Sequence, residues 1–242
     1  MSIRVFYRIS DAGYNKVKPD YVNNENCLRN CVKHFGSDID IIADNVSDET
    51  FDMVKKYVYP LDNIKRTNIK GGNAGSFTML FENALLLDDE TIVYFLEDDY
   101  LHRENSANIL LEGFELGGDY VTLYDHPDKY MSPEMGGNKR NVDGPEETRV
   151  YCSKSTHWKL TNSTTLTFAS KVKTLKEDES IIRKYTNGFH PETHQKTGAA
   201  YDHSLWVHGL INNGRRLLSP IPGYSTHGEI PWMSNFINWE NE

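Results

Sequence analysis

The sequence predicts an α/β fold of the Rossmann-like type, with a mostly parallel central sheet and helices on both of its faces. Two observations carry this prediction. Short apolar segments alternate with amphipathic segments of helical length through the first hundred residues, as in strand–helix units that build a parallel sheet. In addition, Thr91–Leu96 is a continuous apolar run, which is typical of a strand buried on both faces of such a sheet.

The elements of the first half follow in order. The apolar segment Ile3–Ile9 is expected to be the first strand, and Asn24–Phe35 has helical spacing of its apolar residues and stops at Gly36. Ile39–Ala43 is a short strand of the buried type. Ser47 or Asp48 is suited to cap a helix that runs to about Tyr57. The remaining elements are a weakly alternating strand at Asn63–Ile69, an amphipathic helix at Ser76–Leu87 and the strand at Thr91–Leu96.

The second half is less regular. A long stretch rich in glycine, proline and charge, Asp125–Thr148, has no clear period and is of a length usual for functional lids. The expected helices are Arg103–Glu115, Val172–Tyr185 and Asp202–Asn212, and the expected strands are Tyr120–Tyr124, Arg149–Cys152, Ser163–Phe168 and Arg216–Ser219. We find no internal repeat or interdomain linker, and therefore expect a single domain, 1–242.

Composition and charge exclude several classes of protein. The 242 residues contain 38% hydrophobic and 25% charged residues, as in a globular protein. The net charge of −9 has the wrong sign for sequence-independent nucleic-acid binding. The longest apolar runs are far shorter than the roughly 20 residues of a membrane helix, and the N-terminus resembles a strand rather than a signal peptide. We therefore expect a cytoplasmic protein without a transmembrane segment, and Cys27, Cys31 and Cys152 as reduced thiols.

Polar residues gather where the predicted parallel strands end, which is where ligands bind in such sheets. They are Ser10-Asp11, Asp44-Asn45, the glycine-rich Gly71–Gly75 and Glu97-Asp98-Asp99. Three consecutive carboxylates repel one another unless a cation or hydrogen-bond donors compensate them. Their hard oxygens suit Mg²⁺ or Mn²⁺, which often bridge to substrate phosphates. The alternative is a solvated acidic turn.

Three further features have both a structural and a functional interpretation. The glycine-rich segment lets a backbone approach an anion at a helix N-terminus, or is a plain strand-to-helix turn. Asp202 is either a helix N-cap or a general base. His227 lies in a turn next to Gly228 and is either structural or a ligand. Pro191 lies between His190 and His194 and argues against a helix there, and the sequence has no His-Glu-x-x-His pattern, so it does not favour zinc hydrolysis.

These residues together resemble a nucleotide-sugar-dependent glycosyltransferase with the glycosyltransferase-A fold. The layout is similar to that of family 2 enzymes and of the N-acetylglucosaminyltransferase I type, whose acidic motif also reads Glu-Asp-Asp. The matching features are the opening strand, Asp44, Asn73-x-Gly75 before a helix, Glu97-Asp98-Asp99 after its strand, Asp202 at the start of a late helix, and His227. The chain departs from the family in having Tyr201 where an acid usually precedes the base.

The resemblance implies a role for each matching residue. Residues 1–100 would form the nucleotide-sugar-binding half and residues 101–242 the acceptor-binding and catalytic half. Asp99 would bind Mn²⁺ or Mg²⁺, with His227 as a late metal ligand, and Asp202 would be the catalytic base. The donor would be bordered by Ser10, Asp11, Asp44, Asn73, Gly75, Glu97 and Asp98, with Ser10, Asp11 and Asp44 at the base and ribose and Asp98 at the sugar or ribose.

The expected function is therefore metal-dependent transfer of a sugar from a nucleoside-diphosphate sugar to a glycan or other hydroxyl acceptor. UDP is the favoured nucleotide, with GDP and dTDP as alternatives. An attack assisted by Asp202 would invert the anomeric centre. Three other interpretations stay open at this point: a retaining enzyme of the same fold, a nucleotidyltransferase, and a glycan-binding module without activity. The Asp125–Thr148 stretch and the aromatic tail residues Tyr224, Trp232, Phe236 and Trp239 are candidates for acceptor and sugar contacts.

Overall fold

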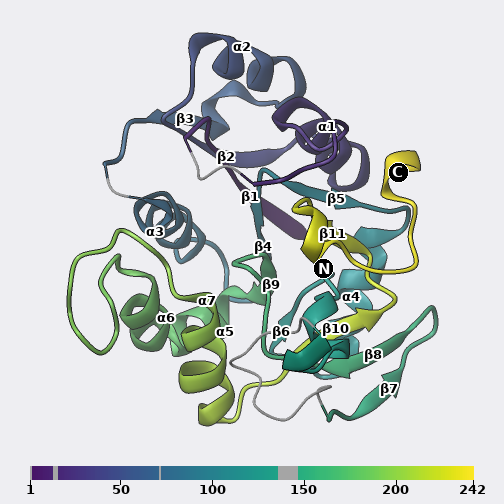
Figure 1. The fold of residues 1–242 in the computed structure, drawn as a ribbon. Helices are drawn as coiled ribbons and strands as arrows, with labels where there is room; N and C mark the ends of the chain where they lie inside the picture. The colour runs from purple at the N-terminus through teal and green to yellow at the C-terminus, as the bar shows by residue number, and fades with distance from the viewer. Residues whose placement is uncertain (1, 13–15, 71, 136–146) are drawn as a thin grey trace.

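The computed structural model describes residues 2–12, 16–70, 72–135 and 147–242, and Figure 1 shows its fold. In these ranges, one mixed sheet of nine strands has the order β3-β2-β1-β4-β9-β6-β10-β8-β7, and a second sheet pairs β11 with β5. The strands are β1 (Ile3–Ile9), β2 (Ile39–Asp44), β3 (Ile64–Thr67), β4 (Ile92–Glu97), β5 (Tyr100–His102), β6 (Tyr120–Val121), β7 (Val150–Cys152), β8 (His157–Leu160), β9 (Phe168–Lys171), β10 (Leu217–Ile221) and β11 (Ser225–His227). The helices are α1 (Asn24–Phe35), α2 (Asp48–Tyr57), α3 (Asn73–Ala84), α4 (Ser106–Glu115), α5 (Val172–Glu177), α6 (Glu179–Thr186) and α7 (Asp202–Ser204).

The α/β fold class predicted from the sequence is confirmed, and the sheet has a parallel and a mixed part. Strands β3, β2, β1 and β4 are all parallel to their neighbours. Strand β9 then runs antiparallel between β4 and β6, and β10 pairs parallel with β6 but antiparallel with β8. The carboxyl ends of β1, β2 and β4 consequently meet at one edge, where polar residues were predicted to gather.

Alternate residues of the central strands pack against opposite layers of helices. On β1, Val5 and Tyr7 belong to a core cluster that includes residues of α1, α2 and α4. Phe6, between them, belongs to a second cluster with residues of α3, α5 and α6. This period of two is the one expected of a strand whose two faces are both covered. Figure 1 shows the two helical layers on either side of the sheet.

Some predicted boundaries are confirmed and others are wrong. The helix Asn24–Phe35 is found with the same bounds, and Ser47 caps α2 by accepting a hydrogen bond from the Thr50 N–H. The predicted strand Ser163–Phe168 is wrong, because the strand is Phe168–Lys171 and the residues before it form a loop. The predicted helix Val172–Tyr185 is broken at Asp178, whose carboxylate accepts hydrogen bonds from Tyr120 and Arg215.

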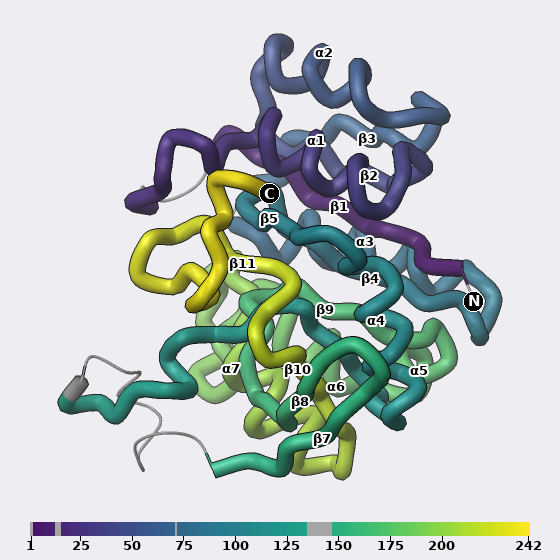
Figure 2. Tube along the Cα trace, turned by 90° about the vertical axis from the view of Figure 1, so that its right-hand side faces the viewer, coloured from purple at the N-terminus to yellow at the C-terminus, as the bar shows by residue number. Residues whose placement is uncertain are grey.

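The C-terminal tail returns to the N-terminal half. Strand β11 pairs antiparallel with β5, and Trp239 packs with Val22, Cys27 and Leu101. Figure 2 shows the tail running past β5 toward α1. Within the described ranges, no helix has the length and apolar character needed to cross a membrane. The three cysteines are free thiols, as predicted.

Candidate functional site

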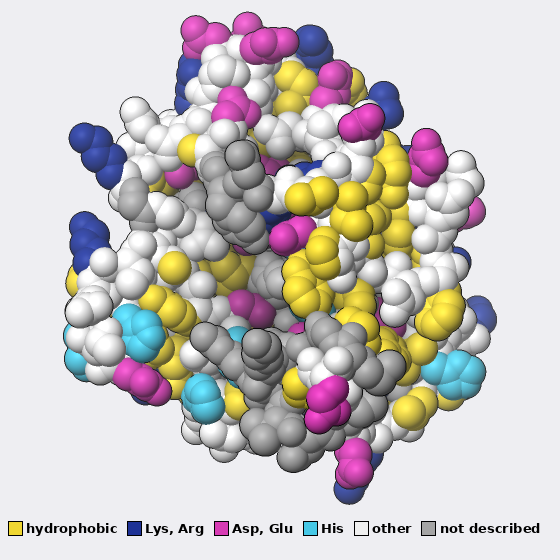
Figure 3. Space-filling model, in the orientation of Figure 1, with side chains coloured by type: hydrophobic (Ala, Val, Ile, Leu, Met, Phe, Trp, Pro, Cys, Tyr) yellow, Lys and Arg dark blue, Asp and Glu magenta, His cyan; other side chains and the backbone are white. Residues whose placement is uncertain are grey.

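A cavity of about 1080 Å³ opens at the edge where β1, β2 and β4 end. Figure 3 shows a hollow in the middle of this face, with acidic and basic side chains inside it and hydrophobic side chains beside it. Nine of the ten residues predicted to form the site line the cavity: Ser10, Asp11, Asp44, Asn73, Glu97, Asp98, Asp99, Asp202 and His227. The predicted strand ends therefore do come together in space.

Gly75 is the predicted residue that lies elsewhere. A Cβ atom at this position would be 2.5 Å from Cγ2 of Ile69, so the glycine lets α3 pack closely against the segment after β3. Asn73, at the start of α3, does line the cavity, and its Oδ1 accepts a hydrogen bond of 2.9 Å from the Ala200 N–H. The glycine-rich segment thus combines a packing role with one cavity-lining side chain.

The carboxylates after β1 and β2 organise the loops around them. Asp11 accepts hydrogen bonds from the Ser47 N–H at 2.7 Å and the Thr50 hydroxyl at 2.9 Å. Partial burial raises its pKa, but these hydrogen bonds outweigh burial and lower the pKa below its ordinary value. Asp44 accepts from the Ile69 N–H at 2.8 Å. Both carboxylates are thereby held at the cavity wall in fixed orientations.

The acidic motif at the end of β4 is compensated by groups from β1 and the segment after it. Glu97 forms an ion pair with Arg8. Asp98 accepts a hydrogen bond of 2.7 Å from the Ser10 N–H. Burial, and then the charge of Asp99, raise the pKa of Asp98 to about 6.

Asp99 is the most closely surrounded of the three acids, with only 1% of its surface exposed. Its Oδ2 lies 2.5 Å from Nζ of Lys16, 3.4 Å from Nζ of Lys18 and 3.3 Å from Nε2 of His227. Burial raises the pKa of Asp99, but the hydrogen bond and charge of His227, together with the two lysines, hold it well below its usual range. The predicted neighbours Asp99 and His227 therefore do meet.

The residues around Asp99 do not fit a divalent cation as they are placed. The ligands would be Oδ2 of Asp99 and Nε2 of His227, yet Nζ of Lys16 lies 2.5 Å from the first and 3.0 Å from the second. An ammonium group thus holds the position that a metal ion would need. Among the residues that the structure describes, no group of three or more His, Cys, Asp and Glu side chains could hold a metal ion.

Asp202 lies on the cavity wall, where it supports a loop. Its two oxygens accept five hydrogen bonds, from the N–H groups of Thr164, Thr165 and Leu166, the Thr164 hydroxyl and Nε1 of Trp206. A carboxylate offers about four lone-pair positions. Its capacity to accept hydrogen bonds is therefore filled by the protein.

The cavity-lining residues that were not predicted from the sequence include Arg8, Lys16, Lys18 and His126. Nδ1 of His126 accepts a hydrogen bond of 3.2 Å from the Asp128 N–H and lies 2.7 Å from Oδ1 of Asp128, so Asp128 fixes the orientation of the ring. The ring of His126 also lies 5.4 Å from that of Trp232, measured between centroids. The sequence signals were present but weak, since a strand arginine, two loop lysines and a histidine before a proline have many structural explanations.

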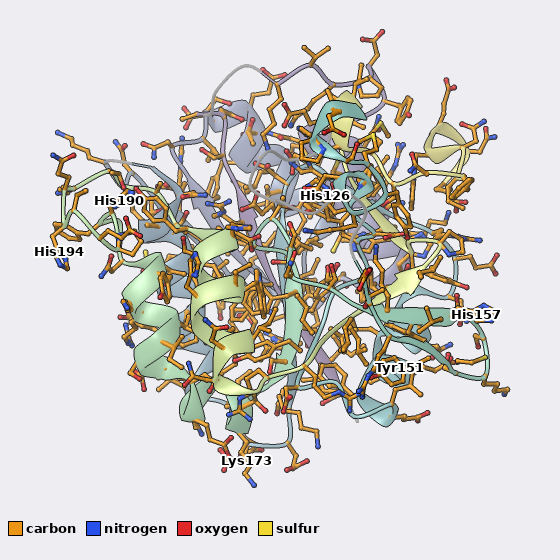
Figure 4. The ribbon with its side chains drawn as sticks, turned by 60° about the horizontal axis from the view of Figure 1, so that its bottom comes forward. His126, Tyr151, His157, Lys173, His190 and His194 are labelled. Carbon is orange, nitrogen blue, oxygen red and sulfur yellow. The ribbon has the colours of Figure 1, made fainter. Side chains whose placement is uncertain are left out.

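The other histidine pair lies apart from this site. Figure 4 shows His190 and His194 on the loop after α6, at the edge of the molecule, whereas His126 lies nearer its middle. Nδ1 of His190 accepts hydrogen bonds from the N–H groups of Glu192 and Thr193, which is a turn-forming role. Of the predicted acceptor-contact segment Asp125–Thr148, residues 136–146 lie outside the described ranges.

Comparison with known proteins identifies the class of fold. No family model and no curated protein sequence matches this chain. The crystal structure of GalNAc-T7 with UDP, GalNAc and Mn²⁺ matches with a TM-score of 0.56 at 10% identity, over 93% of this chain and 43% of that one. The crystal structure of S. aureus TarS matches with a TM-score of 0.49 at 16% identity, over 90% of this chain and 35% of that one.

The likeness to GalNAc-T7 supports, for this chain, the glycosyltransferase-A type of α/β fold that its sequence predicts. At 10% identity the likeness to GalNAc-T7 concerns the fold alone. This chain also spans less than half of the length of either neighbour.

Proposed function

We propose that this chain is a glycosyltransferase that moves a sugar from a nucleoside-diphosphate sugar to an acceptor hydroxyl. The observation that carries the proposal is the acidic motif Glu97–Asp99 at the floor of the large cavity, at the carboxyl edge of the parallel strands. Ligands bind at this edge in open α/β sheets. UDP is the favoured nucleotide, since the structure of GalNAc-T7, whose fold is similar, contains UDP.

The donor would lie along the row of strand ends. Asp11 and Asp44 would face the base and ribose, while Glu97 and Asp98 would contact the ribose or sugar. The leaving diphosphate gains negative charge as the anomeric bond breaks, and fixed positive groups stabilise such charge. Lys16, Lys18 and His227 line the cavity and would supply such positive groups. The predicted Mn²⁺ or Mg²⁺ is supported by the ion present with GalNAc-T7 and opposed by the position of the Lys16 ammonium.

Two groups are candidates for taking the proton from the acceptor hydroxyl. Asp202 was predicted for this role, but its oxygens are already engaged by five donors. His126 lines the same cavity, and it would act as the base from Nε2 in the tautomer whose Nδ1–H donates to the Asp128 carboxylate, 2.7 Å away, instead of accepting from the Asp128 N–H. We favour His126. Inversion, which was predicted on the basis of Asp202, therefore depends on a different residue, and retention of configuration stays an alternative.

Nucleotide binding tests the proposal without knowledge of the acceptor. The melting temperature is measured with UDP, GDP, dTDP, CMP and the triphosphate UTP, each with Mn²⁺ and with EDTA. A ligand at about 100 times its dissociation constant stabilises the folded state by about 2.7 kcal/mol. A rise with one diphosphate that disappears in Asp98→Ala is the expected result. No rise with any nucleotide would favour the glycan-binding module, and a rise with a nucleoside triphosphate alone would favour a nucleotidyltransferase.

A further inference from the structure

The charges around the acidic motif balance among the described residues. Glu97, Asp98 and Asp99 are formally three negative charges, and they lie beside three positive ones. Arg8 pairs with Glu97, and both Lys16 and Lys18 lie within 3.4 Å of Asp99. The repulsion that would call for a divalent ion is therefore already relieved by side chains of the chain itself.

Lys16 is the central member of this set. Its Nζ lies 2.5 Å from Oδ2 of Asp99 and 3.0 Å from Nε2 of His227, and its side chain is only 15% exposed. A buried carboxylate such as Asp99 is costly without a paired cation. The ammonium group therefore has a structural reason to stay at this position, close to the cavity that it lines.

We propose that Lys16 is the built-in cation of the nucleotide site, and that the chain binds a nucleoside diphosphate without a divalent metal. This inference rests on the proposed function. Lysine binds phosphate as a point charge with three N–H donors. From a position between Asp99 and His227, one flexible side chain can be shared between the buried carboxylate and the diphosphate, with Lys18 as a second positive charge beside it.

The test is isothermal titration calorimetry of the full chain with UDP and with GDP, in EDTA and in Mn²⁺, with uridine and guanosine as phosphate-free probes. We expect the wild type to bind one diphosphate in EDTA with a dissociation constant within about threefold of that in Mn²⁺. Lys16→Met should weaken diphosphate binding in EDTA by tenfold or more while the nucleoside binds as before, which shows that the variant is folded. Lys16→Arg, which keeps the charge, should retain most of the affinity.

Lys173→Met is the matched control. Lys173 is an exposed lysine of α5, at the lower edge of the molecule in Figure 4, and its loss should leave nucleotide binding unchanged.

Electron paramagnetic resonance supplies a readout that needs no nucleotide. The signal of free Mn²⁺ should persist when the wild-type chain is added in equimolar amount, since the Lys16 ammonium lies between Oδ2 of Asp99 and Nε2 of His227.

The outcomes separate this inference from the proposed function. Diphosphate binding by the wild type that requires Mn²⁺, or unchanged binding by Lys16→Met in EDTA, would overturn the role of Lys16 and leave the glycosyltransferase proposal intact. Loss of the free Mn²⁺ signal with the wild type alone would also count against Lys16. Absence of nucleotide binding under both conditions would overturn the proposed function itself, and the role of Lys16 with it.

Discussion

The carboxylate of Asp202 holds two residues in the left-handed backbone region. Thr165 has a φ of 46° and Leu166 a φ of 60°. Such conformations cost non-glycine residues about 1–3 kcal/mol each, and they persist where the surroundings fix them. Both N–H groups donate to Asp202, at 3.0 Å and 2.9 Å. The side chain predicted as a base thus shapes a loop that lines the cavity.

Replacing Asp202 by asparagine tests this structural role. The amide keeps one acceptor oxygen and turns N–H donors toward the backbone N–H groups of the loop. Because buried donors left without partners cost about 1–3 kcal/mol, we expect Asp202→Asn to lower the free energy of unfolding by about 2–3 kcal/mol, measured by urea denaturation. Asp52→Asn on α2, where the side chain is 66% exposed, is the control and should change it by less than about 0.5 kcal/mol. Unchanged stability with lost turnover would instead support Asp202 as the base.

His102 makes the stability depend on pH. It is fully buried on β5, and burial, followed by the charge of His34, lowers its pKa to about 3. The unfolded chain binds a proton there below about pH 6.5, whereas the folded chain does so only near pH 3. The free energy of unfolding should therefore fall as pH decreases between these values, by up to about 1.4 kcal/mol per pH unit. His102→Gln should flatten this slope in urea denaturation at several pH values, and an identical slope would contradict the assignment.

At the scale of elements, the helices and strands that could be predicted are those whose own residues carry a strong pattern. The helix α1 begins after the capping residue Asn23 and ends at Gly36, whose φ is 87°. Cys27, Leu28 and Cys31 fall on its buried face at helical spacing. The central strand β4 could be predicted for a similar reason, because its continuous run of buried residues fits no other type of element. These elements could be predicted because propensity, periodicity and boundary residues agree.

Other elements depend on partners far away in the sequence. Strands β5 and β11 have three residues each and form a two-stranded sheet, with one further bridge from Ser225 of β11 to Tyr124. Neither has enough local pattern to be predicted, yet their register places His227 opposite Tyr100, next to Asp99. The strand predicted at Ser163–Phe168 was displaced because Asp202 draws the backbone of Thr164–Leu166 into a loop. In each case, contacts with residues far away in the sequence determine the local structure.

At the scale of the whole molecule, the acids of the site could be predicted and its cations could not. The carboxylates follow parallel strands directly, so topology alone brings Asp11, Asp44 and Asp99 to one edge. Lys16 and Lys18 belong to an irregular segment after β1, where no period relates a residue to a direction in space. The sequence therefore indicated a need for positive charge, and only the fold shows which side chains lie there.

The C-terminal tail connects stability to the site across the molecule. Trp239 is 3% exposed, packs with Val22, Cys27 and Leu101, and donates from Nε1 to the Ser234 carbonyl at 2.9 Å. The same tail carries β11 and hence His227. An anchor near the end of the chain thus helps to hold a cavity residue in place, so loss of the anchor should affect both folding and nucleotide binding.

We expect Trp239→Ala to lower the free energy of unfolding by about 3–5 kcal/mol, as truncation of a buried tryptophan does. Diphosphate binding should weaken in parallel, because a loosened tail no longer holds His227 beside Asp99. Trp232→Ala is the matched variant, since Trp232 is a half-buried tryptophan of the same tail that lines the cavity, and it should cost clearly less stability. Urea denaturation and calorimetric titration with the diphosphate measure both effects. Equal destabilisation by the two variants would mean that Trp239 is no special anchor, and undiminished diphosphate binding by Trp239→Ala would mean that the site does not depend on the tail.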